Sequence, residues 1–291
     1  MVNVHIVTDS CAHFANPALL RQHPVTVVPN KISLGSKTYR EGIDISAEDA
    51  LTLIAQSPKL VKLSVPTIEE YTAVYNRLSH EADAILSIHA SRELYPSWQN
   101  ARAAAQPMIG STQVAVIDSR TLCVAQGMLV NFATRIAQQD ISFDEMVRQV
   151  RGAADRLYTI YTVEALDFLL ENRIMSPSHT ILGSMLGIKP FVTIEEGRLV
   201  PVEKVKTRTQ TIERLVEFAV EFTEVEDTLI VQNKAQITDL TRALQERLAV
   251  EFPDKEFPYA TYSAAMAMLI GADAAGIVIL ECEMEDLDDD L

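Results

Sequence analysis

The chain is poor in the residues and patterns that mark disulfide-bonded, zinc-binding or membrane-spanning proteins. Its three cysteines, Cys11, Cys123 and Cys282, lie far apart in 291 residues and form no CxxC pair. This odd, sparse set argues against a disulfide framework or a zinc knuckle. The longest apolar run, Ala264–Leu280, is interrupted by Asp273 and falls short of the roughly 18 uninterrupted apolar residues that span a bilayer. Because a secretion signal is also lacking at the start, we expect a cytoplasmic protein without a membrane span.

Positive charge is scarce as well. Lysine and arginine number 25 against 40 acidic residues, so the formal net charge is -15. Such a chain repels phosphate backbones, and we therefore expect no nucleic-acid partner. Part of the charge lies in the acidic end Glu281–Leu291, which is typical of a solvated tail. A tail that docks on a basic partner is the alternative.

Apolar strands alternate with helices of 10–15 residues along the first half of the chain, which predicts a parallel sheet covered on both faces. Ligands bind beyond the carboxyl ends of such strands. Four hydroxyl-bearing segments are expected to converge there, and they are Thr8–Ser10, Ser64–Thr67, His89–Ser91 and Asp118–Ser119.

The pattern changes after Asp155. The second half is expected to mix helices with strands, some of them antiparallel, including a hairpin over Ile188–Val202. We therefore predict an α/β fold with an N-terminal α/β/α domain over residues 1–155 and a smaller C-terminal α/β domain over residues 156–291. No flexible linker joins them, so the two domains are expected to pack firmly.

Motifs of the common enzyme classes are absent. The sequence contains no GxGxxG after its first strand, no P-loop, no HExxH and no GxSxG, and no two histidines have the i, i+4 spacing of a metal site. His89, Asp9, Asp118 and Cys123 could carry chemistry, but structural roles explain each of them: a hydrogen-bonded histidine, two capping carboxylates and a buried thiol. We predict a protein that is not an enzyme and needs neither a cofactor nor a metal.

Short motifs in a fixed order make the chain similar to the DegV family of bacterial fatty-acid-binding proteins. Each motif is short, but the series extends over more than 200 residues. The segments that carry the resemblance are IVTDS at Ile6–Ser10, Val27–Ser46, LSVPTIEEY at Leu63–Tyr71, LYPSWQNA at Leu94–Ala101, VIDSRT at Val116–Thr121, LDFLLENRI at Leu166–Ile174 and Gly187–Arg208.

The resemblance implies that a long acyl chain is buried between the two domains. In the family, hydroxyl groups of a T-S-x-P-S and an L-S-G-T-Y motif hold the fatty-acid carboxylate. Ser64 and Thr67 match the first motif, and Tyr95 and Ser97 match positions of the second. Some members present the fatty acid to a separate kinase, and Arg173 matches the arginine of the family's G-G-R-I motif, so it is the candidate for contact with such a partner.

The sequence departs from the family pattern at the expected headgroup site. Tyr95 replaces a serine that is a principal carboxylate ligand, and Pro96 replaces a glycine and removes a backbone donor. Asp273 lies near the position of a histidine in the family's H-x-G-P-G segment, where an acidic group would repel a carboxylate. The phenol of Tyr95 or the hydroxyl of Ser97 is the candidate replacement donor.

Three hypotheses follow from the sequence. The leading one is a carrier that holds one long-chain fatty acid or a similar amphiphile, with Met266, Met268 and Leu269 lining a tunnel or belonging to the core. The second is a kinase-like phosphotransferase subunit that uses Asp9 or Asp118 with Mg²⁺. The third is a relative of the family that has lost its ligand and acts through protein contacts.

Overall fold

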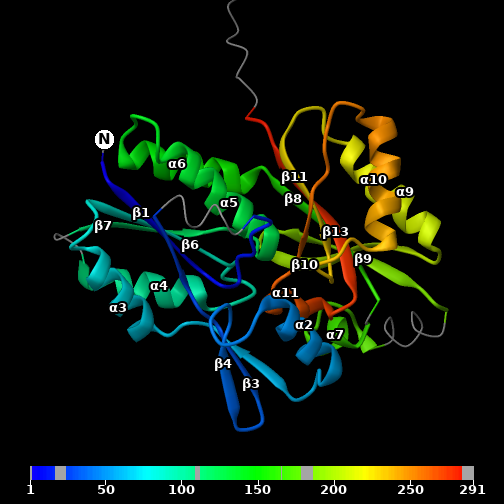
Figure 1. The fold of residues 1–291 in the computed structure, drawn as a ribbon, viewed down its shortest axis with the longest axis horizontal. Helices are drawn as coiled ribbons and strands as arrows, with labels where there is room; N and C mark the ends of the chain where they lie inside the picture. Colours follow the sequence, from blue (N-terminus) through cyan, green and yellow to red (C-terminus); the bar gives the residue numbers. More distant parts are fainter. Residues whose placement is uncertain (1, 17–23, 109–111, 165, 178–185, 284–291) are drawn as a thin grey trace, which may run out of the picture.

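The computed structural model describes residues 2–16, 24–108, 112–164, 166–177 and 186–283. Its first sheet has four parallel strands in the order β2-β1-β6-β7 (Figure 1). Strands β1 (Val4–Asp9) and β6 (Ala84–His89) lie at its centre, between β2 (Val25–Val28) and β7 (Gln113–Asp118). All six residues of β6 are buried, because helices cover both faces of the sheet. The predicted parallel α/β layer is therefore confirmed.

Two pairs of helices form the outer layers. Helices α3 (Ile68–Leu78) and α4 (Ser97–Ala105) lie on one face, and α4 continues into the short 3-10 turn η1 (Gln106–Met108). Helices α5 (Cys123–Ile136) and α6 (Phe143–Asp155) lie on the other (Figure 1).

Helix α3 begins where the sequence predicts. The Thr67 side chain accepts from the Glu70 backbone while the Glu70 side chain accepts from the Thr67 backbone, which is a complete capping box.

A separate three-stranded antiparallel sheet corrects one expectation. Strand β5 (Val61–Ser64) pairs with β3 (Lys31–Leu34), which also forms an antiparallel hairpin with β4 (Lys37–Arg40). The carboxyl end of β5 therefore does not join the ends of the parallel strands. The four residues of β5 are VKLS, in which apolar and polar side chains alternate. This is the pattern of a half-exposed strand in an antiparallel sheet and not of a strand buried in a parallel one. Helix α2 (Ala47–Gln56), capped by Ser46, lies between β4 and β5 in the chain.

The second half of the chain forms a six-stranded sheet in the order β10-β9-β8-β13-β11-β12. All of its neighbouring strands are antiparallel except β11 and β12, as the predicted mixed character requires. The strands are β8 (Leu157–Val163), β9 (Lys189–Glu195), β10 (Arg198–Val205), β11 (Val225–Gln232), β12 (Tyr259–Thr261) and β13 (Ala274–Glu281).

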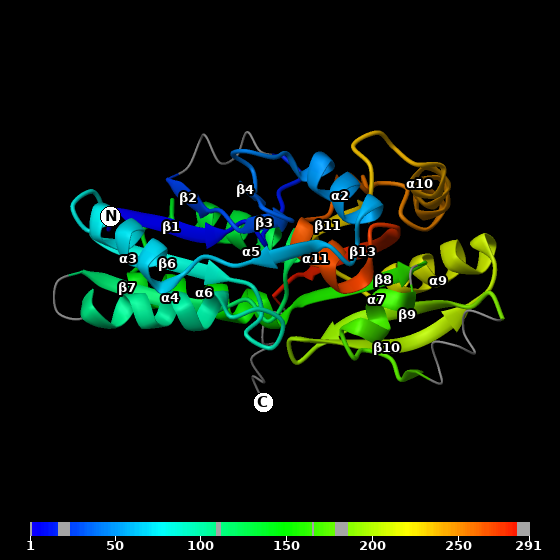
Figure 2. The same cartoon turned by 90° about the horizontal axis from the view of Figure 1, so that it is seen from below.

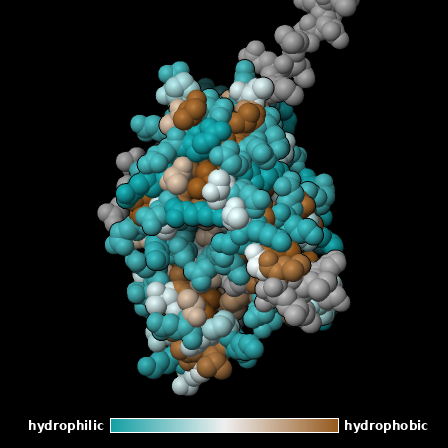
Figure 3. Space-filling model, turned by 90° about the vertical axis from the view of Figure 1, so that its right-hand side faces the viewer, coloured by the Kyte–Doolittle hydropathy of each residue, from teal (hydrophilic) through white to brown (hydrophobic). Residues whose placement is uncertain are grey.

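Helices α9 (Arg208–Val220) and α10 (Asp239–Glu251) cover one face of this sheet with a core of their own. The N-cap of α9 is Thr207, which forms a complete capping box with Gln210. The face of the molecule shown in Figure 3 is mainly hydrophilic, with hydrophobic residues in scattered groups.

Helix α11 (Ala264–Ile270) packs against α2 and against the short helix α7 (Leu166–Glu171) in the middle of the molecule (Figure 2). Its side chains belong to one hydrophobic core that also contains residues of the parallel sheet and of α5. The division after Asp155 stays a prediction, because this core joins both halves.

Three remaining expectations concern one predicted helix, the acidic tail and helices that could cross a membrane. The helix expected from the sequence over Thr180–Leu186 lies outside the described residues except for Leu186, and so does the acidic tail beyond Glu283. Among the residues that are described, no helix has the length and apolar character to cross a bilayer.

Candidate functional site

The carboxyl ends of β1, β6 and β7 meet the second half of the chain at one buried interface. The hydroxyl-bearing residues that follow these strands, Ser10, Ser91 and Ser119, are all buried. The Ser91 hydroxyl donates to the carbonyl of Gly197 at 2.7 Å, in the turn between β9 and β10. A side chain at position 197 would place its Cβ 2.5 Å from the Ser91 oxygen, so this close contact requires glycine.

A buried acid–histidine pair lies at the carboxyl ends of the neighbouring strands β1 and β6. Asp9 Oδ2 and His89 Nδ1 are 2.7 Å apart, and neither side chain is exposed. Ser87 Oγ is 2.6 Å from His89 Nε2, and the Tyr75 hydroxyl is 2.7 Å from Ser87 Oγ. Burial alone would raise the pKa of Asp9, but the hydrogen bond and charge of His89 outweigh it and hold the pKa below its usual value. The order Ser–His–Asp resembles a hydrolase triad, yet all three side chains are fully buried, so the group is a closed structural network.

Glu41 links the β3–β4 excursion to α11. Its Oε2 accepts from the Ser10 hydroxyl at 2.7 Å and from Asn30 Nδ2 at 3.1 Å, and its Oε1 accepts from the backbone N–H of Ala264 at 3.1 Å. Burial raises the pKa of Glu41, and these hydrogen bonds offset the rise only in part. The carboxylate therefore holds three distant segments together at an energetic cost.

Tyr95 and Cys123 make two further contacts with the same helix. The Tyr95 hydroxyl donates to the carbonyl of Ala265 at 2.7 Å, and its pKa is raised well above the usual value, mainly by burial. The backbone N–H of Ser263, which caps α11, donates to Cys123 Sγ at 3.1 Å. Burial raises the pKa of Cys123 to about 11, so this thiol is unreactive at neutral pH, as the buried-thiol interpretation predicts.

The structure separates the predicted headgroup residues. Ser97 begins α4 and is fully buried, and its Oγ makes no hydrogen bond of normal geometry. It lies near the Tyr71 hydroxyl, whose pKa burial raises well above the usual value, and Ser97 offsets that rise in part. Ser64 and Thr67 are exposed. Ser64 pairs in register with Lys31, and Thr67 is occupied as the cap of α3. Tyr95 thus lies at the buried interface with α11, and Ser97 is buried near Tyr71, whereas the residues of the first motif are exposed.

The two other predicted residues lie on the surface. Arg173 is exposed directly after α7, with a positive φ of 59°. Asp273 is exposed before β13, where its Oδ1 accepts from Asn233 Nδ2 at 3.0 Å. It borders a groove of about 260 Å³ between α2 and α7, together with Lys59 and Phe168. Asp273 therefore faces solvent, while the Tyr95 hydroxyl donates to the carbonyl of Ala265.

Sequence reasoning missed the central role of Glu41 and Asn30. Both occur in the hairpin excursion without a motif that would connect them to Ser10 or to Ala264, which is 223 residues away from Glu41. Asp9 and His89 were recognised as candidates separately. Their pairing follows from the register of neighbouring strands, in which Thr8 lies opposite Ile88.

The phosphotransferase hypothesis depended on Asp9 or Asp118 as ligands of Mg²⁺. Asp9 is occupied by His89 and by the backbone N–H of Cys11, and Asp118 accepts from the backbone of Arg120. Among the described residues no group of three or more histidine, cysteine and acidic side chains could hold a metal ion.

Comparison with known proteins agrees with this architecture. Residues 3–281 match the model of a family described as uncharacterised proteins of the DegV family. A DegV domain-containing protein of Caldanaerobacter subterraneus subsp. tengcongensis is 27% identical over 286 residues, which cover 97% of this chain and 100% of that protein.

Two solved structures share the fold. A fatty acid binding DegV family protein from Streptococcus agalactiae superposes with a TM-score of 0.86 at 24% identity, covering 97% of this chain and 100% of that one. DegV of Bacillus subtilis, described as a fatty acid binding protein, superposes with a TM-score of 0.81 at 25% identity over the same shares of the two chains. With the family model matched along nearly its whole length, this chain belongs to the DegV family.

Proposed function

We propose that the protein is a carrier that holds one long-chain fatty acid, or a similar amphiphile, between its two halves. The match to the DegV family over residues 3–281 carries this proposal, since the solved relatives named above are described as fatty acid binding. The chemistry of the interface supports it in two ways.

The first support is the apolar surface around α11. Met266 and Leu269 are buried and Met268 is half-buried, and α11 packs between α2 and α7. Methionine side chains adapt readily to irregular apolar ligands. An acyl chain that enters this region gains about 0.8 kcal/mol for each methylene it removes from water. We place the acyl chain along α11 on these grounds.

The second support is the polar end of the same interface. Ser97 Oγ is a buried donor without a regular partner, and a buried polar group that lacks a hydrogen bond is costly. It lies at the start of α4, whose N-cap residue Pro96 provides no side-chain cap. Free backbone N–H groups at a helix start favour a carboxylate. The proposed headgroup ligands are therefore Ser97 and the hydroxyl of Tyr95.

The direct test is equilibrium binding of oleate to the purified, delipidated protein. Ser97→Ala is expected to weaken binding at least about tenfold, because a hydrogen bond to a charged group contributes about 1.5–3 kcal/mol. Ser64→Ala is the matched control, since Ser64 is exposed, and it should bind as the unmodified protein does. A protein that binds neither oleate nor another long-chain amphiphile would refute the proposal.

Presentation of the bound lipid to a separate kinase is the finer part of the proposal. Arg173 supports presentation to a kinase, because its side chain is exposed. It lies two residues after α7, where its backbone φ is positive. Arg173→Ala should leave oleate binding unchanged. It should reduce phosphorylation of the bound fatty acid by a separate fatty acid kinase. Unchanged phosphorylation would exclude Arg173 from the contact.

A further inference from the structure

Strand β7 leaves one edge of the parallel sheet open. It pairs with β6 along its whole length, and in the part of the chain that the structure describes no strand pairs with its other side. Proteins usually protect such an edge with lysine, proline, a bulge or a very short strand. The six residues of β7 read QVAVID and contain none of these features. An edge of this kind is a template for another strand.

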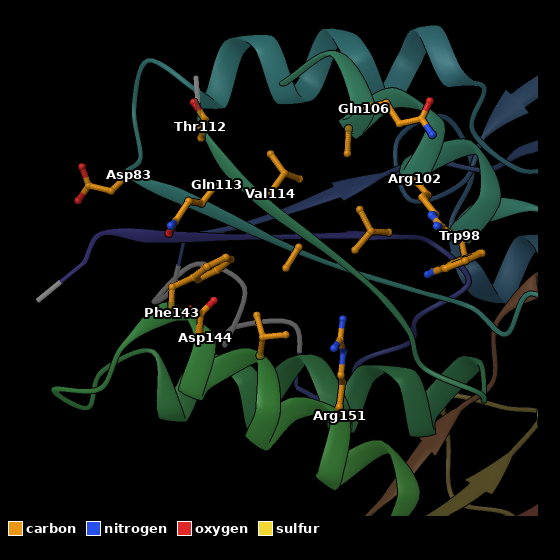
Figure 4. Close-up of a pocket in the computed structure, with 14 residues that line it drawn as sticks. Asp83, Trp98, Arg102, Gln106, Thr112, Gln113, Val114, Phe143, Asp144 and Arg151 are labelled. Atoms are coloured by element: carbon orange, nitrogen blue, oxygen red, sulfur yellow. The ribbon is translucent and has the colours of Figure 1, made fainter. Parts of the chain in front are cut away.

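A groove of about 1140 Å³ runs along this edge between α4 and α6 (Figure 4). Trp98 and Ala105 of α4 form one wall, and Phe143 and Val147 of α6 form the other. Val114 and its neighbours on β7 are only half-buried, although the central strand β6 is fully buried. The floor of the groove is therefore an apolar strand that solvent reaches.

The groove carries opposite charges at its two ends. Asp83 and Asp144 lie near the amino end of β7, and Arg102 and Arg151 lie toward its carboxyl end (Figure 4). All four are exposed, and the ion pairs found among the described residues include none of them. Within the described part of the chain, Asp83 accepts a hydrogen bond from the backbone N–H of Asn3. The groove thus has charges of both signs that form no ion pair among the described residues, and it has no net charge; the Arg102 guanidinium lies 5.0 Å from the centre of the Trp98 ring.

We propose that β7 is the seam of a two-fold symmetric dimer, in which the β7 strands of two copies of this chain pair antiparallel. A two-fold axis brings the same patch of both subunits together, so each end of one strand faces the opposite end of its partner. The acidic end of one groove then lies against the basic end of the other, and both charge clusters gain partners. The two four-stranded sheets become one continuous sheet of eight strands.

Charge favours a second copy over a basic partner protein. Outside the groove, the net charge of -15 makes the surface repel another copy of the chain and attract basic proteins. The groove itself differs from the rest of the surface in this respect. The four charges of the groove cancel, and only an antiparallel arrangement places unlike charges opposite one another at both ends. A basic partner strand would meet Arg102 and Arg151 with like charge.

The test measures the mass of the full chain in solution by sedimentation equilibrium. The unmodified protein is expected to approach twice the monomer mass of 32.3 kDa as its concentration rises. Arg102→Glu with Arg151→Glu makes the groove wholly acidic, and Asp83→Lys with Asp144→Lys makes it basic. Each double variant alone should dimerise at least about tenfold more weakly, because like charges then meet at both ends.

Mixing the two double variants is the decisive step. Their grooves are complementary, so an equimolar mixture should regain the dimer, which a folding defect would not permit. Arg242→Glu, an exposed arginine on α10, is the control and should leave the dimer unchanged. A monomeric unmodified protein at its highest soluble concentration, double variants that dimerise normally, or a mixture that stays monomeric would each overturn the proposal.

Discussion

Acid should destabilise this protein partly through His13, and replacing that residue isolates the effect. Burial lowers the pKa of His13 to about 4 from an ordinary value of 6.5. Its Nε2 lies 3.0 Å from the Thr261 hydroxyl on β12, so His13 joins the two halves. His13→Gln keeps a neutral hydrogen-bonding group at every pH and is therefore the informative change.

The sign follows from proton binding. Between pH 6.5 and 4 the unfolded chain binds a proton at His13 and the folded chain does not, so the free energy of unfolding falls as the pH falls. The effect is absent well above pH 6.5 and, at pH 4.5, amounts to about 2–3 kcal/mol, since one pKa unit corresponds to 1.36 kcal/mol. The predicted stability of His13→Gln matches the unmodified protein at pH 7.5 and exceeds it by this amount at pH 4.5.

Urea unfolding at the two pH values measures the difference directly. His80→Gln, at an exposed histidine, is the control and should follow the unmodified protein at both pH values. If His13→Gln loses as much stability in acid as the unmodified protein does, then the depressed pKa of His13 is not a source of acid sensitivity and the reasoning fails.

Three further substitutions test the buried network and the glycines of α5 and α6. Asp9→Asn leaves His89 without its charged partner at full burial and should cost about 3–5 kcal/mol of unfolding free energy; a loss below about 1 kcal/mol in urea unfolding would show that the pair is dispensable. Gly127→Ala places a Cβ 2.0 Å from the backbone oxygen of His13 and should destabilise by at least about 1–3 kcal/mol. By contrast Gly152→Ala, at a helical glycine with open space around it, should stabilise by about 0.5–1 kcal/mol; equal effects in thermal unfolding would contradict this contrast.

Local structure in this chain is largely predictable from sequence. The capping box at Thr67, the parallel strands β1, β6 and β7, and the hairpin of β9 and β10 all follow from short-range patterns. These features depend on interactions within a few residues or on one repeated strand–helix unit. Strand β5 was assigned to the wrong sheet, although its residues VKLS alternate apolar and polar side chains as in a half-exposed antiparallel strand.

The candidate site is less predictable because its contacts are long-range. Glu41 bonds to Ala264 and Tyr95 bonds to Ala265, and each contact joins segments more than 150 residues apart. Position within a family motif pointed to Tyr95, which contacts α11, and to the buried Ser97, but also to Ser64, which is exposed. Motif position reports where a residue lies in the chain, whereas the site depends on which surfaces the fold brings together.

Lipid occupancy tests the central claim most directly. The measurement is native mass spectrometry of the protein purified from a bacterial host, followed by extraction and identification of anything bound. The account predicts an adduct with the mass of one long-chain fatty acid on each chain, released on denaturation. A bare chain mass that stays unchanged after incubation with long-chain fatty acids would contradict it.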